Sequence, residues 1–585
     1  MIKKIFLTFF IVQLITFVTT IVGILVDGMV TGRFLGTDAM AAYGMVTPFL
    51  TLVTALATAS SVGTSTLISS KLGRGEVEEM QKDFRICFWS ILLFACAVGG
   101  TICVLAGPIA TALKAEGDVH RMAEDYLRVY SLGFPAIFIV TLSIPTLQII
   151  RRRLALISAI FVMLAVNVSM DFLNVLVWHK GMAGMALATT VSNFCALLIA
   201  VSAIMYKGST FSLKPIMPKV PVLKEMFVYG APNAVSFGCR NILIILLNSL
   251  ILNIAGIQMV AVYAAIMTSI NITLSVGTGL ASGVSMLTGV FSGEKDRHDL
   301  RKLVELSVRY SVIFGGITSA AYVVFSGGIV SLFLKEQGLH DAASTGLKIV
   351  ALYSIFFSIN FCIRSFYQAM KMKITLLYAV VNCLLSTLFF AYVLGHSIGI
   401  VGVWIAYPLG ETMTFVLFGA YALWKERDKK SLGITERIMM IPDEYYSETE
   451  PIEVSVASMK DAVAASQSTS QYMKEHGASD RIAVYAALAV EEMAGNIIQH
   501  GFKDGKHHHL DIKLKKDGDR WILRFRDDCR DFDPVAYVKS ITPEQKESHY
   551  GIRMIYGLAD EVKYLSMMKL NNLLICFRTS DNNCS

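Results

Sequence analysis

Four polar side chains lie within otherwise apolar stretches of the first 200 residues, and their oxygen atoms could bind a cation. Asp27 ends the first stretch in ILVDGMVTGRFLG, and VNVSMDFLN places Asn167 and Asp171 four residues apart, on one face of a helix. Thr189 in ALATTVSNF adds a hydroxyl. This set suits a hard cation such as Na⁺ or a shared proton, because neighbouring carboxylates cannot both ionise cheaply in lipid. The alternative is that these residues lie at the membrane interface or form polar contacts between packed helices.

Three charged residues occupy later apolar stretches: Arg240, Arg364 and Glu411. Arginine side chains within a membrane would repel a cationic substrate unless a negative group pairs with them. They therefore indicate either a charge pair with Glu411 or the binding of an anionic group of a substrate. The alternative is that the arginine side chains extend along their helices to the polar interface.

A third group of polar residues follows the apolar region and could bind a nucleotide. ALAVEEMAGNIIQHG places Glu492 and Asn496 one helical turn apart, which suits a carboxylate acting as a base beside an amide that holds Mg²⁺. In LRFRDDCRDFDP, acidic residues beginning at Asp527 directly follow a predicted strand. In ESHYGIRMIYGLADEVKY, Gly551 precedes a helix whose first amide groups could face a phosphate.

The composition excludes a purely soluble protein. Of the 585 residues, 54% are hydrophobic and 17% are charged, whereas soluble domains average about 25% charged residues. With only 13 prolines and so many apolar residues, disordered and collagen-like chains are excluded as well. The ten cysteines contain no CxxC pair, which favours a reducing compartment over a disulfide framework or a zinc site.

The long apolar stretches are confined to the first three quarters of the chain. Residues 1–430 form a near-continuous series of stretches of about 20 residues, each long enough to cross a hydrocarbon core of about 30 Å as a helix. This region has 33 Lys and Arg against 21 Asp and Glu, whereas residues 431–585 have 19 against 24. A basic membrane domain therefore precedes a mildly acidic soluble one.

The pattern predicts twelve membrane-spanning helices. They are centred within residues 5–26, 42–69, 86–112, 127–150, 154–177, 183–205, 226–254, 258–291, 306–333, 347–370, 374–394 and 397–423. With the N-terminus inside, the inner loops hold 23 basic residues and the outer loops hold seven, as the positive-inside rule requires. We expect a multi-pass protein of a bacterial plasma membrane with both termini in the cytoplasm. Its first span is expected to be an uncleaved anchor, because the apolar run continues past residue 20 without a cleavage motif.

The two halves of the membrane region repeat each other with an offset of about 220 residues. SSVGTSTLISSKLGRGE (60–76) aligns with LASGVSMLTGVFSGEKD (280–296), and GMAGMALA (181–188) aligns with GIVGVWIA (399–406). Six spans per repeat make both halves run in the same direction, related by an axis along the membrane normal. This is a transporter architecture with a substrate path between two lobes. The alternative is that two apolar segments share small residues by chance.

The soluble tail predicts a mixed fold. We expect a strand at 452–456, helices at 458–476 and 479–500, a hairpin over 510–527, a helix at 551–559 and strands at 561–567 and 572–578. The fold class is thus an all-α polytopic membrane protein of twelve helices in two six-helix lobes, followed by an α/β sandwich domain. The expected domains are a first lobe (1–210), a second lobe (211–425), a linker (426–448) and the α/β domain (449–585).

The membrane region resembles the MATE (multidrug and toxin extrusion) family, whose members expel cationic and other amphipathic compounds in exchange for Na⁺ or H⁺. The resemblance covers about the first 425 residues and is carried by DGMVTGRFLG, NVSMDFLNVLV…GMAGMALATTVSNF and APNAVSFGCRNILIILLNSLILNIAG. It implies that Asp27, Asn167, Asp171 and Thr189 form the cation site of the first lobe. The two arginines of the second lobe favour an alternative, a lipid-linked flippase of the same superfamily.

Residues 449–580 resemble the GHKL ATPases, specifically the branch of the anti-sigma-factor serine kinases. The three polar segments of the tail correspond in order to the N, G1 and G2 boxes of that family. The resemblance implies Glu492 as the catalytic base, Asn496 as the Mg²⁺ ligand, Asp527 as the adenine contact and Gly551 beside the phosphates of a bound Mg-ATP. Where the family has D-x-G-x-G, this chain has DDCRD, and a His-Tyr pair precedes Gly551. Glycine allows close backbone approach, so these departures weaken the case for turnover and for ATP binding.

Together these features predict a cation-coupled antiporter that exports small organic compounds by alternating access, with a cytoplasmic nucleotide-binding domain that regulates it. The alternative is a membrane-anchored signalling protein whose tail is a serine kinase or binds a partner. ATP-driven export is disfavoured because the tail has no G-x-x-x-x-G-K-[ST] motif. The expected partners are a small-molecule substrate, the lipid bilayer and a cytoplasmic regulator protein, and no nucleic acid is expected.

Overall fold

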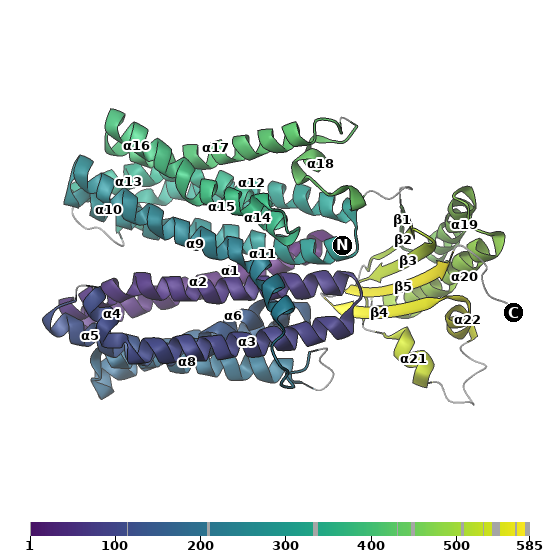
Figure 1. Cartoon of the computed structure of the whole chain (residues 1–585), viewed down its shortest axis with the longest axis horizontal. Coiled ribbons are helices and arrows are strands. Elements are labelled where there is room, and N and C mark those ends of the chain that lie inside the picture. Colours follow the sequence, from purple (N-terminus) through teal and green to yellow (C-terminus); the bar gives the residue numbers. More distant parts are fainter. Residues whose placement is uncertain are drawn as a thin grey trace. The chain divides into compact units, whose positions relative to one another are not determined.

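The computed structural model describes residues 2–113, 115–206, 211–331, 337–429, 431–445, 451–504, 508–530, 532–540, 550–567 and 570–578. The chain divides into two compact units, Ile2–Ile441 and Pro442–Ser585. The first unit is helical, and the second contains a β-sheet (Figure 1).

The first lobe of the helical unit is formed by the helices α1 to α8. They are α1 (Ile2–Val30), α2 (Thr37–Gly73), α3 (Val77–Val104), α4 (Ala106–Ala112), α5 (Gly117–Ser131), α6 (Phe134–Ile149), α7 (Arg153–Leu173) and α8 (Gly181–Ile204). Two π-helical turns, η1 (Thr31–Leu35) and η2 (Asn174–Trp178), extend α1 and α7.

The second lobe is formed by the helices α9 to α17. They are α9 (Val220–Ala255), α10 (Ile257–Ser269), α11 (Asn271–Gly293), α12 (Arg297–Ser331), α13 (Gln337–Val350), α14 (Tyr353–Ala369), α15 (Ile374–Val380), α16 (Ser386–Ile398) and α17 (Ile400–Lys425). A third π-helical turn, η3 (Val381–Leu385), joins α15 to α16.

Nine helices of the described residues are long and apolar enough to cross a membrane, and two bent pairs raise that number to eleven. The bent pairs are α5 with α6, at 52°, and α13 with α14, at 46°. The first predicted span falls on α1, whose 29 residues are about 43 Å long at 1.5 Å per residue. These helices make the chain a multi-pass membrane protein, while the total of twelve spans stays a prediction.

The glycines of the second repeated motif have corresponding conformations and packing in both lobes. Gly181 and Gly399 have φ angles of 56° and 69°, and each lies where the chain turns back between two neighbouring helices. Three residues later, Gly184 and Gly402 pack on the preceding segment. A Cβ on Gly402 would lie 2.2 Å from a backbone oxygen of α16, and one on Gly184 would lie 1.9 Å from Oδ1 of Asn174. The repeat therefore reflects one helix–turn–helix geometry that occurs twice.

The first repeated motif forms the contact between the lobes. Residues 60–76 of α2 and the loop after it pack against residues 280–296 of α11 and its loop. The hydroxyls of Thr66 and Ser285 form a hydrogen bond of 2.9 Å across this contact. A Cβ on Gly73 would lie 1.9 Å from a backbone oxygen of α11, so the two backbones touch directly. The aligned segments are thus partners in space, which the sequence repeat by itself does not reveal.

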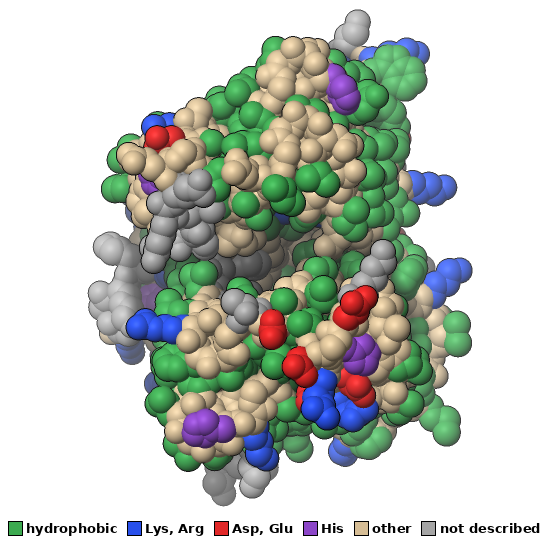
Figure 2. All heavy atoms as spheres, turned by 90° about the vertical axis from the view of Figure 1, so that its left-hand side faces the viewer, with side chains coloured by type: hydrophobic (Ala, Val, Ile, Leu, Met, Phe, Trp, Pro, Cys, Tyr) green, Lys and Arg blue, Asp and Glu red, His purple; other side chains and the backbone are tan. Residues whose placement is uncertain are grey.

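This contact lies at the basic end of the unit, which we define as the end that carries the loops at 74–76, 151–152 and 294–296. Two further helices contribute to it. Gln13 of α1 donates a hydrogen bond to Ser282 of α11 at 3.0 Å, and a Cβ on Gly63 would lie 2.3 Å from a backbone oxygen of α9. At the opposite end the surface is hollowed between the lobes (Figure 2). The lobes are therefore sealed at the basic end and separated at the other.

The soluble unit contains a five-stranded antiparallel sheet in the order β1-β2-β3-β5-β4. Its elements are β1 (Ile452–Val456), α19 (Met459–Glu475), α20 (Asp480–Asn496), β2 (Leu510–Asp517), β3 (Arg520–Asp527), α21 (Pro534–Ser540), α22 (Tyr550–Leu558), β4 (Glu561–Met567) and β5 (Leu570–Arg578). A hydrophobic core that includes Trp521, Leu523 and Phe525 of β3 lies between the sheet and α19 and α20. The predicted strands and helices of the tail are confirmed.

Part of the predicted linker, 426–448, folds onto the membrane unit. The short helix α18 (Ile434–Met439) contacts α12 and α17. Glu436 forms an ion pair of 2.5 Å with Arg297 at the start of α12, and Tyr367 of α14 donates a hydrogen bond to the carbonyl oxygen of Ile438 at 2.6 Å. Ile441 is buried, so the chain leaves the membrane unit only at residue 442.

The substitution Gly73→Ala is expected to destabilise the sealed arrangement, because its methyl group has no room against the backbone of α11. Overpacking of this kind costs about 1–3 kcal/mol. The thermal unfolding midpoint of the purified protein should fall. The matched change Gly100→Ala, in α3 with open space around it, should not lower the midpoint. Equal midpoints for the two variants would contradict the backbone contact between the lobes.

Candidate functional site

Asp27, Asn167 and Asp171 converge between α1 and α7 of the first lobe. The two helices pack side by side, and the side chain of Asp27 lies beside those of both α7 residues. Asp171 is fully buried, Asn167 is buried and Asp27 is half-buried. The spacing of four residues therefore directs two polar side chains of α7 at one carboxylate of α1.

Several polar atoms of this cluster have no partner among the described residues. Both carboxylate oxygens of Asp171, Oδ1 of Asp27 and Nδ2 of Asn167 are buried without a hydrogen bond. Such atoms are costly to bury. A cation bound by the oxygens, or a proton held between the two carboxylates, would remove much of that cost. The donor set of this lobe thus fits Na⁺ or H⁺.

The fourth predicted residue of this site, Thr189, makes its hydrogen bonds within α8. Its hydroxyl donates to the carbonyl oxygen of Met185 at 3.5 Å, and its own carbonyl oxygen accepts from Asn193 at 2.8 Å. The neighbouring Thr190 instead reaches α5 and donates to the carbonyl oxygen of Val129 at 3.2 Å. No hydrogen bond among the described residues joins Thr189 to the acidic cluster, and its role there stays a prediction.

Three tyrosines lie around the acidic cluster, and the sequence did not indicate them. Tyr43 of α2 lies near both Asp27 and Asp171, and Tyr130 of α5 lies near Asp27. Tyr126 connects the two, with its ring centroid 5.8 Å from that of Tyr43 and 5.6 Å from that of Tyr130. Tyrosines in apolar helices have the spacing of ordinary packing residues, so no signal in the sequence distinguishes these three.

Each predicted polar cluster lies beside a π-helical turn. η1 begins four residues after Asp27, and η2 begins three residues after Asp171. In the second lobe η3 contains Asn382, and in the soluble unit η5 (Ile497–Gly501) directly follows Asn496. Such turns are rare and are often found at functional sites, where they change the direction of side chains along a helix.

Glu411 of α17 is the centre of a buried hydrogen-bond network in the second lobe. Its Oε2 accepts from Asn360 of α14 at 2.6 Å and from Asn382 of η3 at 2.7 Å. The hydroxyl of Tyr378 donates to Oδ1 of Asn360 at 2.7 Å. The carboxylate is therefore satisfied by two amides rather than by an arginine. The sequence does not indicate either asparagine, because each lies singly in an apolar stretch.

Arg240 and Arg364 lie near Glu411 without forming an ion pair with it among the described residues. Arg364 is 2% exposed, so it does not extend to the interface. Its Nη1 donates to Sγ of Cys383 at 3.2 Å, and its guanidinium carbon lies 4.4 Å from the ring centroid of Phe361. The predicted charge pair is thus not a direct contact among the described residues, although the two guanidinium groups lie near the carboxylate of Glu411.

Glu492, Asn496 and Gly551 lie together in the soluble unit. Nδ2 of Asn496 donates to Oε1 of Glu492 at 3.0 Å along α20. Gly551, at the start of α22, packs directly on the carboxyl group of Glu492, and a Cβ there would lie 2.1 Å from Cδ of that residue. The absence of a side chain at Gly551 is what allows this approach.

Asp527, at the end of β3, is buried and bonded to its own neighbours. Its Oδ1 accepts from Nδ2 of Asn571 on β5 at 2.8 Å and from the backbone amide of Cys529 at 2.9 Å. Burial raises the pKa of Asp527, and these two hydrogen bonds partly oppose the shift. Asn571 lies directly opposite Asp527 in the β-ladder. The sequence did not indicate it, because a pairing across strands is not visible in the order of residues.

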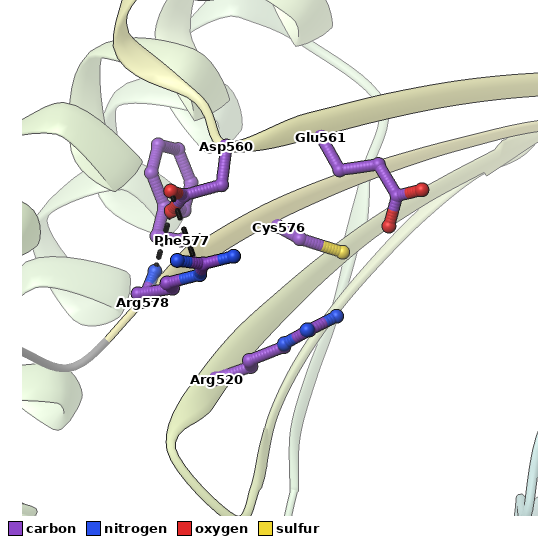
Figure 3. Close-up of a pocket in the computed structure, with 6 residues that line it drawn as sticks. All are labelled: Arg520, Asp560, Glu561, Cys576, Phe577 and Arg578. Carbon is purple, nitrogen blue, oxygen red and sulfur yellow. Dashed lines mark hydrogen bonds and ion pairs between the residues drawn. The ribbon is translucent and has the colours of Figure 1, made fainter.

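A surface pocket of about 270 Å³ lies at the other end of β3 (Figure 3). It is lined by Arg520, Asp560, Glu561, Cys576, Phe577 and Arg578. The carboxylate of Asp560 accepts from the backbone amide of Arg578 at 2.7 Å. Arg520 begins the strand that Asp527 ends, so this pocket is separate from the predicted nucleotide residues.

The geometry defines a class of protein: a polytopic membrane protein of two repeated lobes, followed by a soluble α/β domain. The MatE family model matches residues 7–173 and 232–393, which is more than half of the chain. A histidine kinase-like ATPase model matches residues 456–576. The chain belongs to the MatE family and carries a C-terminal histidine kinase-like ATPase domain.

Relatives and solved structures agree with this assignment. The chain is 24% identical over 427 residues to the probable multidrug resistance protein YoeA of Bacillus subtilis, a match that covers 69% of this chain and 90% of YoeA. The fold is similar to that of a MATE crystallised in complex with MaL6, with a TM-score of 0.69, 19% identity and coverage of 74% of this chain and 98% of that one. A MOP superfamily transporter of Pyrococcus furiosus, described as having a binding pocket of reverse polarity, has a TM-score of 0.65, 21% identity and coverage of 71% and 94%.

The substitution Asn571→Ala is expected to destabilise the soluble unit by about 1–3 kcal/mol, because it removes a hydrogen bond from a buried carboxylate. The loss should depend on pH. The pKa of Asp527 is higher in the folded than in the unfolded state, so its burial costs stability above the folded pKa and costs nothing below the unfolded one. The loss should therefore be larger near neutral pH than at about pH 4.

Denaturant unfolding of residues 442–585 measures this effect through Trp521, which is the one tryptophan of that segment and is fully buried. The control is Asn572→Ala, one position along the strand, whose side chain accepts from Arg526 and not from the buried acid. A loss for Asn571→Ala that is the same at both pH values would show that Asp527 is not the group involved.

Proposed function

We propose that the membrane unit is an antiporter that exports small amphipathic organic compounds in exchange for Na⁺ or H⁺. The cluster of Asp27, Asn167 and Asp171, with its buried oxygens that lack partners, supports this best. A cation that binds one conformation more tightly than the other shifts the equilibrium between them. Membership of the MatE family, together with the multidrug resistance name of its relative YoeA, supports an exporter.

The contact between the lobes can distinguish the two states that such a cycle needs: it is closed in one state and open in the other. We infer that the basic end faces the cytoplasm of a bacterial cell, because the positive-inside rule places loops rich in Lys and Arg there. Both termini then lie in the cytoplasm, and the structure is an outward-open state of the transporter. Separation of the segments 60–76 and 280–296, with closure of the lobes at the other end, would give the inward-open state.

The substitution Asp171→Asn is expected to abolish gradient-driven transport, with a loss of at least about tenfold, because it removes a charge from the cation site while keeping its shape. The measurement is uptake of a fluorescent amphipathic dye into everted vesicles under an imposed Na⁺ or H⁺ gradient. Asp38→Asn, which changes an exposed carboxylate in the first turn of α2, is the control and should transport normally.

The two gradients are applied separately, so the same assay identifies the coupling ion. The proposal fails if neither gradient drives transport by the unmodified protein. It also fails if Asp171→Asn and Asp38→Asn retain the same gradient-driven activity.

We propose that the soluble unit regulates transport from the cytoplasm by binding Mg-ATP, a small regulator protein, or both. The match to a histidine kinase-like ATPase and the contacts among Glu492, Asn496 and Gly551 support the nucleotide. α18 supports the coupling, because the chain enters the soluble unit directly after a helix that is bonded to Arg297 of α12. A change in the soluble unit can thus act on a helix of the second lobe through a short segment.

The full-length protein is expected to bind a fluorescent ATP analogue, mant-ATP, in a Mg²⁺-dependent manner. Asn496→Ala should weaken this binding by about tenfold or more, because one lost charge-assisted or metal contact is worth about 1.4 kcal/mol or more. Gln471→Ala, at an exposed position of α19, should leave it unchanged. If the unmodified protein binds no mant-ATP with or without Mg²⁺, the nucleotide role is lost and regulation by a protein partner remains.

The ATPase-like domain also favours a second function, in which the membrane unit anchors a serine kinase or partner-binding module. The vesicle assay separates the two. Transport by a chain shortened to residues 1–441 would exclude a membrane unit that serves only as an anchor, since that unit has its own compact fold.

A further inference from the structure

Two guanidinium groups in the second lobe form no ion pair with an acidic residue in the part of the chain that the structure describes. Arg364 is 2% exposed, and its Nε is buried without a hydrogen bond among the described residues. Its one hydrogen bond among these residues goes to a sulfur, a weak acceptor. Arg240 is half-buried, and its described contact is with the ring of Phe357, whose centroid lies 5.2 Å from the guanidinium carbon.

The nearby carboxylate does not provide the missing partner. Glu411 already accepts hydrogen bonds from two asparagine amides through the same oxygen, Oε2. Two arginines and one glutamate give the cluster a net charge of +1. A buried charge of this kind is stable only when a counterion or ligand balances it.

The cluster is one connected site. Arg240 lies over Phe357 and Arg364 lies over Phe361, and the centroids of these two rings are 5.5 Å apart. A Cβ on Gly277 of α11 would lie 2.6 Å from the ring of Phe357. α11 is one of the helices that contact the first lobe, so the site lies next to the interface between the lobes.

We propose that Arg240 and Arg364 form an oxyanion-binding site, which takes the carboxylate or phosphate group of an amphipathic organic compound. Guanidinium groups bind planar or tetrahedral oxyanions by paired hydrogen bonds. The two phenylalanine rings provide an apolar surface for the remainder of the compound. As a description of the transported substrate, this inference rests on the proposed transport function; as a binding site, it does not.

The division of charge between the lobes then has a simple meaning. The first lobe holds unpaired carboxylates, which suit the coupling cation, and the second holds unpaired guanidinium groups, which suit the cargo. Two sites of opposite charge in separate lobes do not compete for one ligand. Compounds with a free carboxylate or phosphate should therefore be preferred over compounds that are only cationic.

Binding of a rhodamine carboxylic acid and of its methyl ester to the purified full-length protein tests the site. The two dyes differ only in the free carboxylate, and fluorescence polarisation gives both affinities. The acid should bind more tightly than the ester. Arg240→Gln should weaken binding of the acid by about tenfold or more and leave binding of the ester nearly unchanged. Arg309→Gln, which removes an exposed arginine of α12, is the matched control.

Two further variants separate ligand binding from a purely structural role. Arg364→Lys keeps the charge but loses the paired hydrogen bonds, so it should weaken binding of the acid less than Arg364→Gln does. Glu411→Gln removes the competing negative charge and should strengthen binding of the acid several-fold. A structural role would instead change the affinities of acid and ester together.

The source of the oxyanion is resolved by repeating the measurement in lipid nanodiscs. If a lipid headgroup occupies the site, the acid should bind more weakly in phosphatidylglycerol than in phosphatidylcholine, and Arg240→Gln should remove that difference. If the ligand is a soluble compound, the affinities should agree in the two lipids. Equal affinity of the unmodified protein for acid and ester would overturn the proposal. The acid's affinity is measured at equilibrium without an ion gradient, so a failure of cation coupling is distinguishable from a failure of this site.

Discussion

The direct backbone contact between the segments 60–76 and 280–296 is the constraint on which the arrangement of the membrane unit depends. In lipid, apolar side chains gain little by leaving the acyl chains for another helix. Helices therefore associate where small residues let their backbones approach each other. Gly73 and Gly293 meet this requirement, since a Cβ on either would lie about 2 Å from a backbone oxygen of the other segment. Because the contact is confined to the basic end, the lobes are free to separate at the other. One short glycine-containing segment, repeated once, thereby decides which end of the molecule is closed.

The two lobes hold polar clusters of opposite character. The fifth span of each repeat contains a π-helical turn, η2 at the end of α7 and η3 between α15 and α16, but the two turns do not align at the repeat offset of about 220 residues. In the first lobe, the acids near the turn have buried oxygens without a hydrogen bond among the described residues, whereas in the second lobe Oε2 of Glu411 accepts two amide hydrogen bonds and two arginines lie nearby without an ion pair in the part of the chain that the structure describes. The two repeats therefore differ both in the position of the helix irregularity and in the charge of the residues near it. Repeated lobes with equal chemistry would bind the same ligand twice, and lobes with opposite chemistry can bind two different ones.

The sequence predicts the elements well and the contacts between them poorly. Apolar stretches and alternation located the membrane helices and every strand of the soluble sheet, because these patterns are local. The bends at Leu132 and Ala351 were missed, since a helix that breaks within an apolar stretch leaves the hydropathy unchanged. Asn167 and Asp171 can be paired from their spacing on one helix, whereas Asp27 is indicated only as another carboxylate within an apolar stretch and through the family resemblance. Tyr43, Asn360 and Asn571 reach their sites across helices or strands, which no single segment encodes. The sequence does not predict α18, because six residues with few apolar positions carry too little signal.

The altered glycine box of the soluble unit illustrates how a local departure can be compensated elsewhere. Cys529 stands where related ATPases have the first glycine after the aspartate, which suggests a loop too crowded to form. The structure places its side chain against Gly501, where a Cβ would lie 2.8 Å from Sγ of Cys529. Gly501, at the end of η5, has no side chain and therefore leaves room for the side chain of Cys529. The backbone amide of Cys529 still donates to Asp527, so the aspartate keeps the hydrogen bond that fixes its orientation. Replacement of a motif glycine therefore argues against a nucleotide site only where no neighbouring residue makes room for the new side chain. Here Gly501 makes that room.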